Sequence, residues 1–287
     1  MADPVPITEA PLLDVRHLSK QFPIGGLIHT INLQALQDVS FSVKRGEVIS
    51  VVGESGSGKS TTARAVARLI APTSGEIVFN GVDMLKKEPR RPSLHYRGEV
   101  QMVFQDPFGS LNPVHSIGHH LTRPLQIHRK TRGRGETRDA MHELLRTVGL
   151  EPAATYASKF PHQLSGGQRQ RVAIARALAP DPKLLLADEP ISMLDVSIRM
   201  GILNLMERLK HERGLAYLYI THDLASARYI GAAAEPPVVA QCATPARSTA
   251  AVSTRAIRRA ASAARSSAES TTVTVGSPRS REIATER

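Results

Sequence analysis

A glycine-rich segment with one lysine offers the first site for chemistry. Residues 53–60 read GESGSGKS and match the pattern G-x-x-x-x-G-K-[ST]. Glycines let backbone N–H groups wrap a phosphate, and a helix starting near Lys59 adds the positive end of its dipole. Lys59 would then reach the outer phosphates of a nucleotide, and the Ser60 hydroxyl would bind Mg²⁺. The predicted nucleotide-binding residues are Gly53, Glu54, Ser55, Gly56, Ser57, Gly58, Lys59, Ser60 and Thr61.

Two adjacent carboxylates supply a second candidate site. Asp188 and Glu189 directly follow the apolar run Leu184–Ala187. We expect Asp188 to hold Mg²⁺, usually through water, and Glu189 to polarise the water that attacks the γ-phosphate. Two acids after a strand are often only a solvated strand end. Their combination with the phosphate-binding pattern favours the catalytic interpretation.

A third segment has the features of an anion site. Ser165, Gly166, Gly167 and Gln168 precede a helix-forming stretch, so a serine cap and two glycines leave backbone donors bare at a helix N-terminus. One chain would have to fold back unusually to bring this segment to the γ-phosphate held by its own Lys59. The pattern therefore predicts a two-chain sandwich, in which each nucleotide contacts both chains.

The elements that must position these residues can be read from three continuous apolar runs. Val48–Val52 precedes the glycine segment, Leu184–Ala187 precedes the two acids, and Leu218–Ile220 precedes His222. Such runs suit parallel strands buried on both faces, and ligands bind beyond the carboxyl ends of such strands. We therefore expect an α/β fold whose strand ends converge on one crevice.

Further elements flank this predicted sheet. Leu12–Val15 and Val39–Val43 read as strands of an antiparallel N-terminal sheet. Helical patterns cover residues 59–70, 138–148 and 169–178, and the region between the first two apolar runs is expected to hold an inserted helical subdomain.

Composition limits the class of protein. The chain has 287 residues, 41% of them hydrophobic, and a single cysteine, Cys242, which excludes a disulfide framework within one chain. No apolar run is long enough to span a bilayer, and the N-terminus lacks the pattern of a secretory leader, so we expect a cytoplasmic location.

The net charge of +11 raises the alternative of a nucleic-acid surface. Eight Arg and four Glu place +4 of this charge in residues 231–287. Aromatic residues make up only 4% of the chain, so a platform for stacking bases is not evident. We expect no nucleic-acid partner.

Leu164–Gln168 resembles the signature of ABC transporter ATPases, and the other family motifs follow in order over about residues 12–230. The resemblance implies a P-loop NTPase fold of ABC type, with a mostly parallel core sheet, an antiparallel N-terminal sheet and an inserted helical subdomain. It also implies ATP and Mg²⁺ as cofactors. The chain is thus predicted to be an ATP-hydrolysing subunit that energises transport.

The resemblance assigns roles to four more residues. Phe22 resembles the aromatic that stacks on adenine, and Gln105 resembles the glutamine that contacts Mg²⁺ and the membrane partner. Asp195, in the segment Ser192–Asp195, is similar to the residue of the loop that joins two ATPase chains. His222 resembles the histidine that contacts the γ-phosphate. Gln105, Glu189 and His222 form the predicted catalytic set, and Ser60, Gln105 and Asp188 the predicted metal set.

Two longer strings point to one branch of the family. Residues 103–113 (VFQDPFGSLNP) and 161–171 (PHQLSGGQRQR) resemble ATPases of oligopeptide, dipeptide and nickel importers. This resemblance implies membrane permease subunits, a second identical or homologous ATPase subunit, an extracytoplasmic solute-binding protein acting indirectly, and a peripheral location on the cytoplasmic face of the membrane. Ile191-Ser192-Met193 stands where many relatives have Thr-Ser-Ala, so the cargo stays open, an oligosaccharide included.

The composition changes after Ile230, which suggests two parts: an ATPase domain over 1–230 and a tail over 231–287. The tail contains no Leu, Phe, Tyr, Trp, Lys or Asp, whereas Ala, Arg, Ser and Thr supply 38 of its 57 residues. Such a segment buries little apolar surface, and we expect it to be disordered. A shifted reading frame in a GC-rich gene would give this composition, as would a diverged tail. A remnant that binds ATP without coupling it to transport, and an ABC ATPase acting on DNA or ribosomes, remain alternatives.

Overall fold

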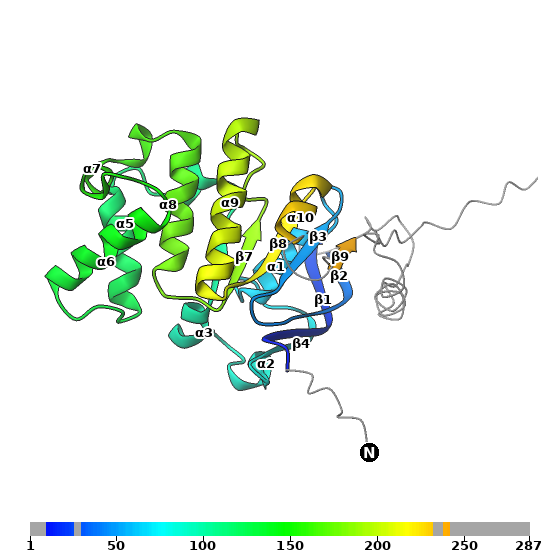
Figure 1. The fold of residues 1–287 in the computed structure, drawn as a ribbon. Coiled ribbons are helices and arrows are strands. Elements are labelled where there is room, and N and C mark those ends of the chain that lie inside the picture. Colours follow the sequence, from blue (N-terminus) through cyan, green and yellow to red (C-terminus); the bar gives the residue numbers. More distant parts are fainter. Residues whose placement is uncertain (1–9, 26–29, 232–237, 242–287) are drawn as a thin grey trace, which may run out of the picture.

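The computed structural model describes residues 10–25, 30–231 and 238–241. These residues form two sheets and a set of helices (Figure 1). None of the helices in this part of the chain combines the length and apolarity needed to cross a bilayer.

The first sheet is antiparallel and has the strand order β2-β1-β4-β5. Its strands are β1 (Leu13–Gly25), β2 (Thr30–Val43), β4 (Ser74–Phe79) and β5 (Val82–Asp83). Leu13 pairs with Val43 on one side and with Phe79 on the other. The predicted N-terminal sheet is present, and its first two strands are longer than the apolar alternation indicated.

The second sheet is parallel and has the order β6-β7-β8-β3-β9. Its strands are β3 (Val48–Val52), β6 (Val100–Val103), β7 (Leu184–Asp188), β8 (Ala216–Thr221) and β9 (Val238–Gln241). Every residue of β3, β7 and β8 is buried. The three continuous apolar runs are therefore the central strands of a sheet covered on both faces, as predicted.

Neighbouring residues on these strands belong to two different hydrophobic clusters. On β7, Leu185 and Ala187 belong to one cluster, and Leu184 and Leu186 to the other. The first cluster includes residues of α8 (Gly166–Leu178) and α9 (Val196–Arg213), and the second includes residues of α1 (Lys59–Val66) and the antiparallel sheet. Since side chains alternate along a strand, the parallel sheet separates two apolar layers.

The remaining helices complete the molecule. Short helices α2 (Met84–Lys87), α3 (Leu94–Glu99) and α4 (Pro107–Ser110) flank β6. The inserted subdomain consists of α5 (Ile117–Ile127), α6 (Arg134–Thr147) and α7 (Ala153–Ser158), with α8 beside it (Figure 1). The last helix is α10 (Leu224–Gly231), which contacts β3 and β8. The predicted α1 was too long at its C-terminal end, and α6 and α8 begin earlier than their patterns indicated.

Part of the predicted tail takes a defined place. Gly231 is the last residue of α10, and β9 pairs in parallel with β3, from Ile49 opposite Val238 to Val52 opposite Gln241. The segment expected to be disordered thus contains one strand, because backbone pairing needs few large side chains. Residues 232–237 and 242–287 lie outside the described residues, so the prediction for them stays a prediction.

Two glycines in or next to β4 differ in how closely the rest of the chain approaches them. Gly75 and Gly81 both have positive φ, at 105° and 78°. A Cβ at Gly75 would lie 2.6 Å from the His17 carbonyl oxygen and 2.6 Å from the Leu18 Cα, whereas a Cβ at Gly81 would meet nothing within 4 Å. Gly81→Ala should cost about 1 kcal/mol through strain alone. Gly75→Ala should cost more than about 3 kcal/mol, since backbone atoms must also move.

Urea unfolding of the two variants measures both losses. Equal destabilisation would show that the close approach of β1 to Gly75 does not constrain the fold.

Candidate functional site

The loop between β3 and α1 closes around the side chain of Lys59. Lys59 Nζ donates to the carbonyl oxygens of Gly53 and Glu54, both at 2.7 Å, and to Ser57 Oγ at 3.3 Å. The side chain is buried, with the residue only 5% exposed. The loop therefore holds a desolvated ammonium at the N-terminus of a helix, where backbone donors and the helix dipole also favour an anion.

Glycine is required at position 58 because the loop lies against β2. Gly58 has φ 90°, and a Cβ there would lie 2.6 Å from the Ala35 carbonyl oxygen. Its next contact would be Leu36 Cδ2, at 2.9 Å. The antiparallel sheet thus supports the phosphate-binding loop from the side.

Phe22 lies on β1, the strand that pairs with β2. Lys20 of β1 pairs with Leu36, which contacts the loop, and Phe22 follows two residues later opposite Leu33. Lys20 Nζ lies 4.9 Å from the centroid of the Phe22 ring, within range of a cation–π contact. The ring is half-buried, and its predicted stacking on adenine stays a prediction.

Ser60 and Asp188 meet across the site. Ser60 Oγ donates to Asp188 Oδ1 at 2.8 Å, which joins the first turn of α1 to the end of β7. Asp188 is 2% exposed. Burial raises the pKa of its carboxyl above the ordinary value, and the hydrogen bond from Ser60 acts in the opposite direction. These two predicted metal-binding residues are in direct contact.

Three strand ends converge on the Glu189 carboxylate. Gln105 Nε2, beyond β6, donates to Glu189 Oε2 at 3.0 Å. His222 Nδ1, beyond β8, lies 3.3 Å from the same oxygen. The Glu189 N–H donates to the Ile220 carbonyl at 2.9 Å, and its φ of 45° turns the side chain out of the strand direction. All three predicted catalytic residues are brought together.

The donor set suits a cation that prefers oxygen. In the described ranges no group of three or more His, Cys, Asp or Glu could hold a metal ion. A cation beside Ser60 and Asp188 would need a hydroxyl, one carboxylate, the Gln105 amide and ligands from a nucleotide. Mg²⁺ binds in this manner, with one or two carboxylates and substrate phosphates. Gln105 contacts Glu189 in this structure, so its predicted metal role stays a prediction.

His222 lies in a turn after β8. The other residues of this turn were not among the predicted site residues. Asp223 N–H donates to Thr221 Oγ1 at 3.0 Å, and Ser226 Oγ donates to the Asp223 carbonyl at 2.9 Å. A threonine two residues before an aspartate is typical of turns in which the threonine hydroxyl accepts from a backbone N–H. That signal was available in the sequence around His222.

The segment Leu164–Gln168 forms a reciprocal cap at the start of α8. Ser165 Oγ accepts from the Gln168 N–H at 3.3 Å, and Gln168 Oε1 accepts from the Ser165 N–H at 3.0 Å. Gln168 Nε2 also donates to the Tyr156 hydroxyl at 3.1 Å. Tyr156 lies twelve residues earlier, so no local motif could have indicated this contact.

The same segment packs against the start of α9. A Cβ at Gly167 would lie 2.4 Å from Ile198 Cγ2, so only glycine fits between the two helices. Asp195 is exposed at the N-cap of α9 and makes no side-chain cap hydrogen bond. Around it Met193, Val196 and Met200 are 56%, 76% and 44% exposed. An apolar surface therefore borders the segment that is predicted to meet a second chain.

The chain is similar to known proteins over most of its length. The family model described as "ABC transporter" matches residues 36–192, more than half of the chain. The chain belongs to the ABC transporter ATPase family. The oligopeptide transport ATP-binding protein OppF of Bacillus subtilis is 45% identical over 221 residues, which cover 76% of this chain and 70% of OppF. The glutathione import ATP-binding protein GsiA of Salmonella typhimurium is 46% identical over 220 residues. That match covers 75% of this chain and 34% of GsiA.

Solved structures agree with the family. A dimeric post-hydrolysis state of the ATP-binding cassette MJ0796 bound to ADP and Pi has a TM-score of 0.64 and 32% identity, covering 76% of this chain and 90% of the cassette. The cbiO1 structure from Clostridium perfringens has a TM-score of 0.61 and 29% identity, covering 75% and 80%. The predictions of family, fold class, ATP as cofactor and an ATP-binding, ATP-hydrolysing transporter subunit are confirmed.

The burial of Asp188 leads to a prediction about how the stability of the fold depends on pH. Its raised pKa means that the ionised carboxyl is less favourable in the folded chain than in the unfolded chain. The contribution of Asp188 to the free energy of unfolding is then most favourable below the ordinary pKa of aspartate and falls as the pH rises towards the raised folded value. At neutral pH without nucleotide or metal, Asp188→Asn should therefore raise stability, by about 0.5–2 kcal/mol.

Thermal melting between pH 4 and neutral pH, on the order of one unit per step, measures this effect. The exposed Asp139→Asn serves as control, because Asp139 is 75% exposed. A lower melting temperature for Asp188→Asn at neutral pH would contradict the assigned strain.

Proposed function

We propose that this chain hydrolyses Mg-ATP to drive an importer of oligopeptides, dipeptides or a similar solute. The observation that carries the proposal is the convergence of Gln105, Glu189 and His222 next to the Ser60–Asp188 pair. The names of the relatives, which include oligopeptide transport and glutathione import, support a peptide-like cargo. An oligosaccharide cargo is the second possibility for this branch.

Binding of ATP uses the loop Gly53–Thr61. The nucleotide's β- and γ-phosphates replace the loop carbonyls as partners of Lys59, and the backbone N–H groups at the start of α1 face the same phosphates. Phe22 covers the adenine. Ser60, Asp188 and Gln105 would hold Mg²⁺, whose charge would offset that of the phosphates.

Hydrolysis depends on the placement of one carboxylate. Glu189 orients the attacking water and accepts its proton as the bond from the water oxygen to the γ-phosphorus forms. The bond from the γ-phosphorus to the bridging oxygen breaks at the same time, and ADP leaves with that oxygen. The hydrogen bond from Gln105 fixes the Glu189 side chain, and His222 lies close enough to contact the γ-phosphate as well as Glu189. Positioning and charge stabilisation supply most of the acceleration in phosphoryl transfer of this type.

A second ATPase subunit, identical or homologous, completes each site. Ser165, Gly166, Gly167 and Gln168 of that subunit face the γ-phosphate held by Lys59, and Asp195 lies in the contact between the two chains. The exposed Met193, Val196 and Met200 support an interface here, since apolar side chains grouped on a surface favour association. The matched MJ0796 structures are themselves dimeric.

Closure of the dimer acts on separate permease subunits at the cytoplasmic face of the membrane, where the protein is peripheral. Gln105 connects the site to α4 and the inserted subdomain, which follow it in the chain. A solute-binding protein delivers the cargo to the permease and contacts this subunit only indirectly. Residues 1–230 carry the ATPase, and the tail 231–287 adds little beyond β9.

Lys59→Ala should weaken ATP binding by at least about tenfold, because it removes a charged donor to the phosphates. Titration with a fluorescent ATP analogue measures the affinity. The matched control is Lys44→Ala, an exposed lysine in the turn after β2, which should bind as the parent does. Unchanged affinity in a folded Lys59→Ala protein would remove the loop from the site.

Glu189→Gln should bind Mg-ATP but hydrolyse it at least about 100-fold more slowly, since an amide cannot accept the proton. Size-exclusion chromatography with ATP should then show a stable dimer. The exposed Glu212→Gln is the control and should leave turnover unchanged. Parent-like hydrolysis by Glu189→Gln would exclude Glu189 as the base.

A further inference from the structure

A basic pocket of about 490 Å³ lies at the C-terminal end of α1. The residues after α1, the start of β4 and the segment between α2 and α3 line it. The phosphate-binding loop is at the opposite end of α1, and eight helical residues rise about 12 Å. The pocket is therefore separate from the ATP site.

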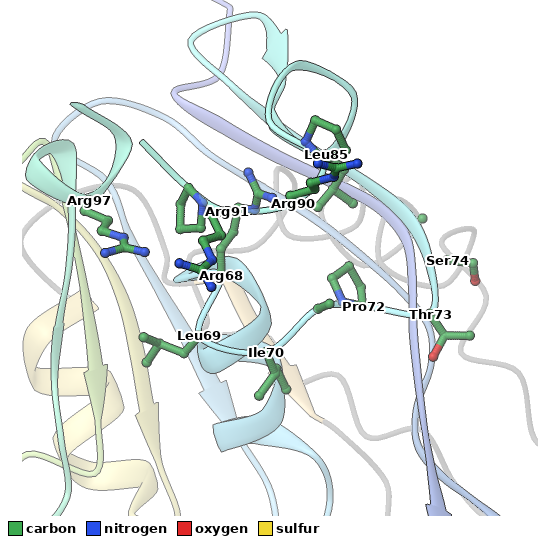
Figure 2. Close-up of a pocket in the computed structure, with 14 residues that line it drawn as sticks. Arg68, Leu69, Ile70, Pro72, Thr73, Ser74, Leu85, Arg90, Arg91 and Arg97 are labelled. Carbon is green, nitrogen blue, oxygen red and sulfur yellow. The ribbon is translucent and has the colours of Figure 1, made fainter. Parts of the chain in front are cut away.

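Four arginines line this pocket: Arg68, Arg90, Arg91 and Arg97. Figure 2 shows Arg68, Arg90 and Arg91 close together, with the Arg97 side chain directed towards Arg68 from the neighbouring helix. They come from three different segments of the chain. Their convergence is therefore a product of the fold and not of local sequence alone.

Arg68 forms a fixed base for the group. Its side chain is 6% exposed, and it donates to the Met84 carbonyl at 2.9 Å and to the Glu88 carbonyl. The Glu88 carboxylate lies 3.6 Å away. Arg68 is thus immobilised between the end of α1 and the segment that carries Arg90 and Arg91.

The segment with Arg90 and Arg91 is closed and stiff. Pro89 and Pro92 flank the two arginines, and proline fixes φ. The Glu88 carboxylate accepts from the Ser93 N–H at 2.7 Å, which ties the two ends of this short loop together. A loop held in this manner presents its side chains with little further loss of backbone entropy on binding.

Arg68 is paired with Glu88, whereas the positive charges of the other three arginines are not balanced by nearby acids. For Arg90, Arg91 and Arg97, no carboxylate within ion-pair distance occurs in the part of the chain that the structure describes. The neighbouring acids have other partners: Glu76 and Asp83 pair with Lys86, and Glu99 pairs with Lys183. Arg90, Arg91 and Arg97 are exposed, so an anion can reach them.

We propose that this pocket binds the phosphate group of a second ligand, distinct from the ATP being hydrolysed. Guanidinium groups match phosphate oxygens in paired hydrogen bonds, and several of them converge here on a rigid frame. Leu69, Ile70, Pro72 and Leu85 line the rest of the pocket and provide an apolar wall for an organic substituent. A soluble phosphate ester and a lipid phosphate headgroup share this chemistry.

The first arm of the test uses inorganic pyrophosphate and the full chain with Lys59→Ala, which disables the ATP loop. Isothermal titration at low salt should show one bound pyrophosphate. The double change Arg90→Gln, Arg91→Gln should weaken this binding at least about tenfold. The matched control is Arg132→Gln, Arg134→Gln, which removes the same charge from exposed positions before and at the start of α6 and should change affinity less than about twofold.

The second arm measures flotation with vesicles that contain phosphatidate. If Arg90→Gln, Arg91→Gln weakens only the binding of pyrophosphate, the ligand is a soluble phosphate compound. If it weakens the binding to vesicles, the ligand is a lipid headgroup. Either result supports the site. Equal behaviour of the two double variants in both arms, or no binding of either probe, overturns it. With Lys59 intact, Arg90→Gln, Arg91→Gln should retain parent ATP hydrolysis, which separates this result from a failure of the proposed function.

Discussion

The structure depends on one constraint: a parallel sheet buried on both faces has room for charged side chains only where its strands end. Three strands, β3, β7 and β8, are buried along their whole length. Lys59 follows the loop after β3, Glu189 follows β7 directly, and His222 follows β8 directly. Parallel pairing then brings those ends to one edge. The hydrophobic layers therefore place the ATPase residues, although none of those residues contributes to the layers.

The same constraint explains what the sequence could predict. Continuous apolar runs ending in GESGSGKS, Asp-Glu and Thr-His were enough to predict the central strands and the convergence of their ends, and the resemblance drew attention to Gln105. Contacts set by long-range packing could not be predicted. The Tyr156–Gln168 hydrogen bond and the fit of Gly167 against Ile198 depend on how α7, α8 and α9 meet in space. The strand β9 was missed because its pairing is carried by backbone groups, which composition does not reveal.

Two ionisable side chains of the site are buried. Asp188 is buried with one hydroxyl partner, and Lys59 is buried among carbonyls. Each of these two side chains is hydrogen-bonded to neutral groups. A bound Mg-nucleotide would add negative charge beside Lys59 and positive charge beside Asp188, which would offset part of the free energy that their burial costs. By contrast, most surface ion pairs here join exposed side chains and contribute little.

The pairing of β9 with β3 has a consequence for how this chain tolerates change. β3 is the strand that leads into the phosphate-binding loop, and β9 covers its outer edge through main-chain hydrogen bonds over four residues. Such bonds are available to almost any extended segment without proline. The pairing itself therefore requires an extended backbone and no particular side chain. The chain can accept a C-terminal region of unusual composition and still shield the strand that supports its most constrained loop.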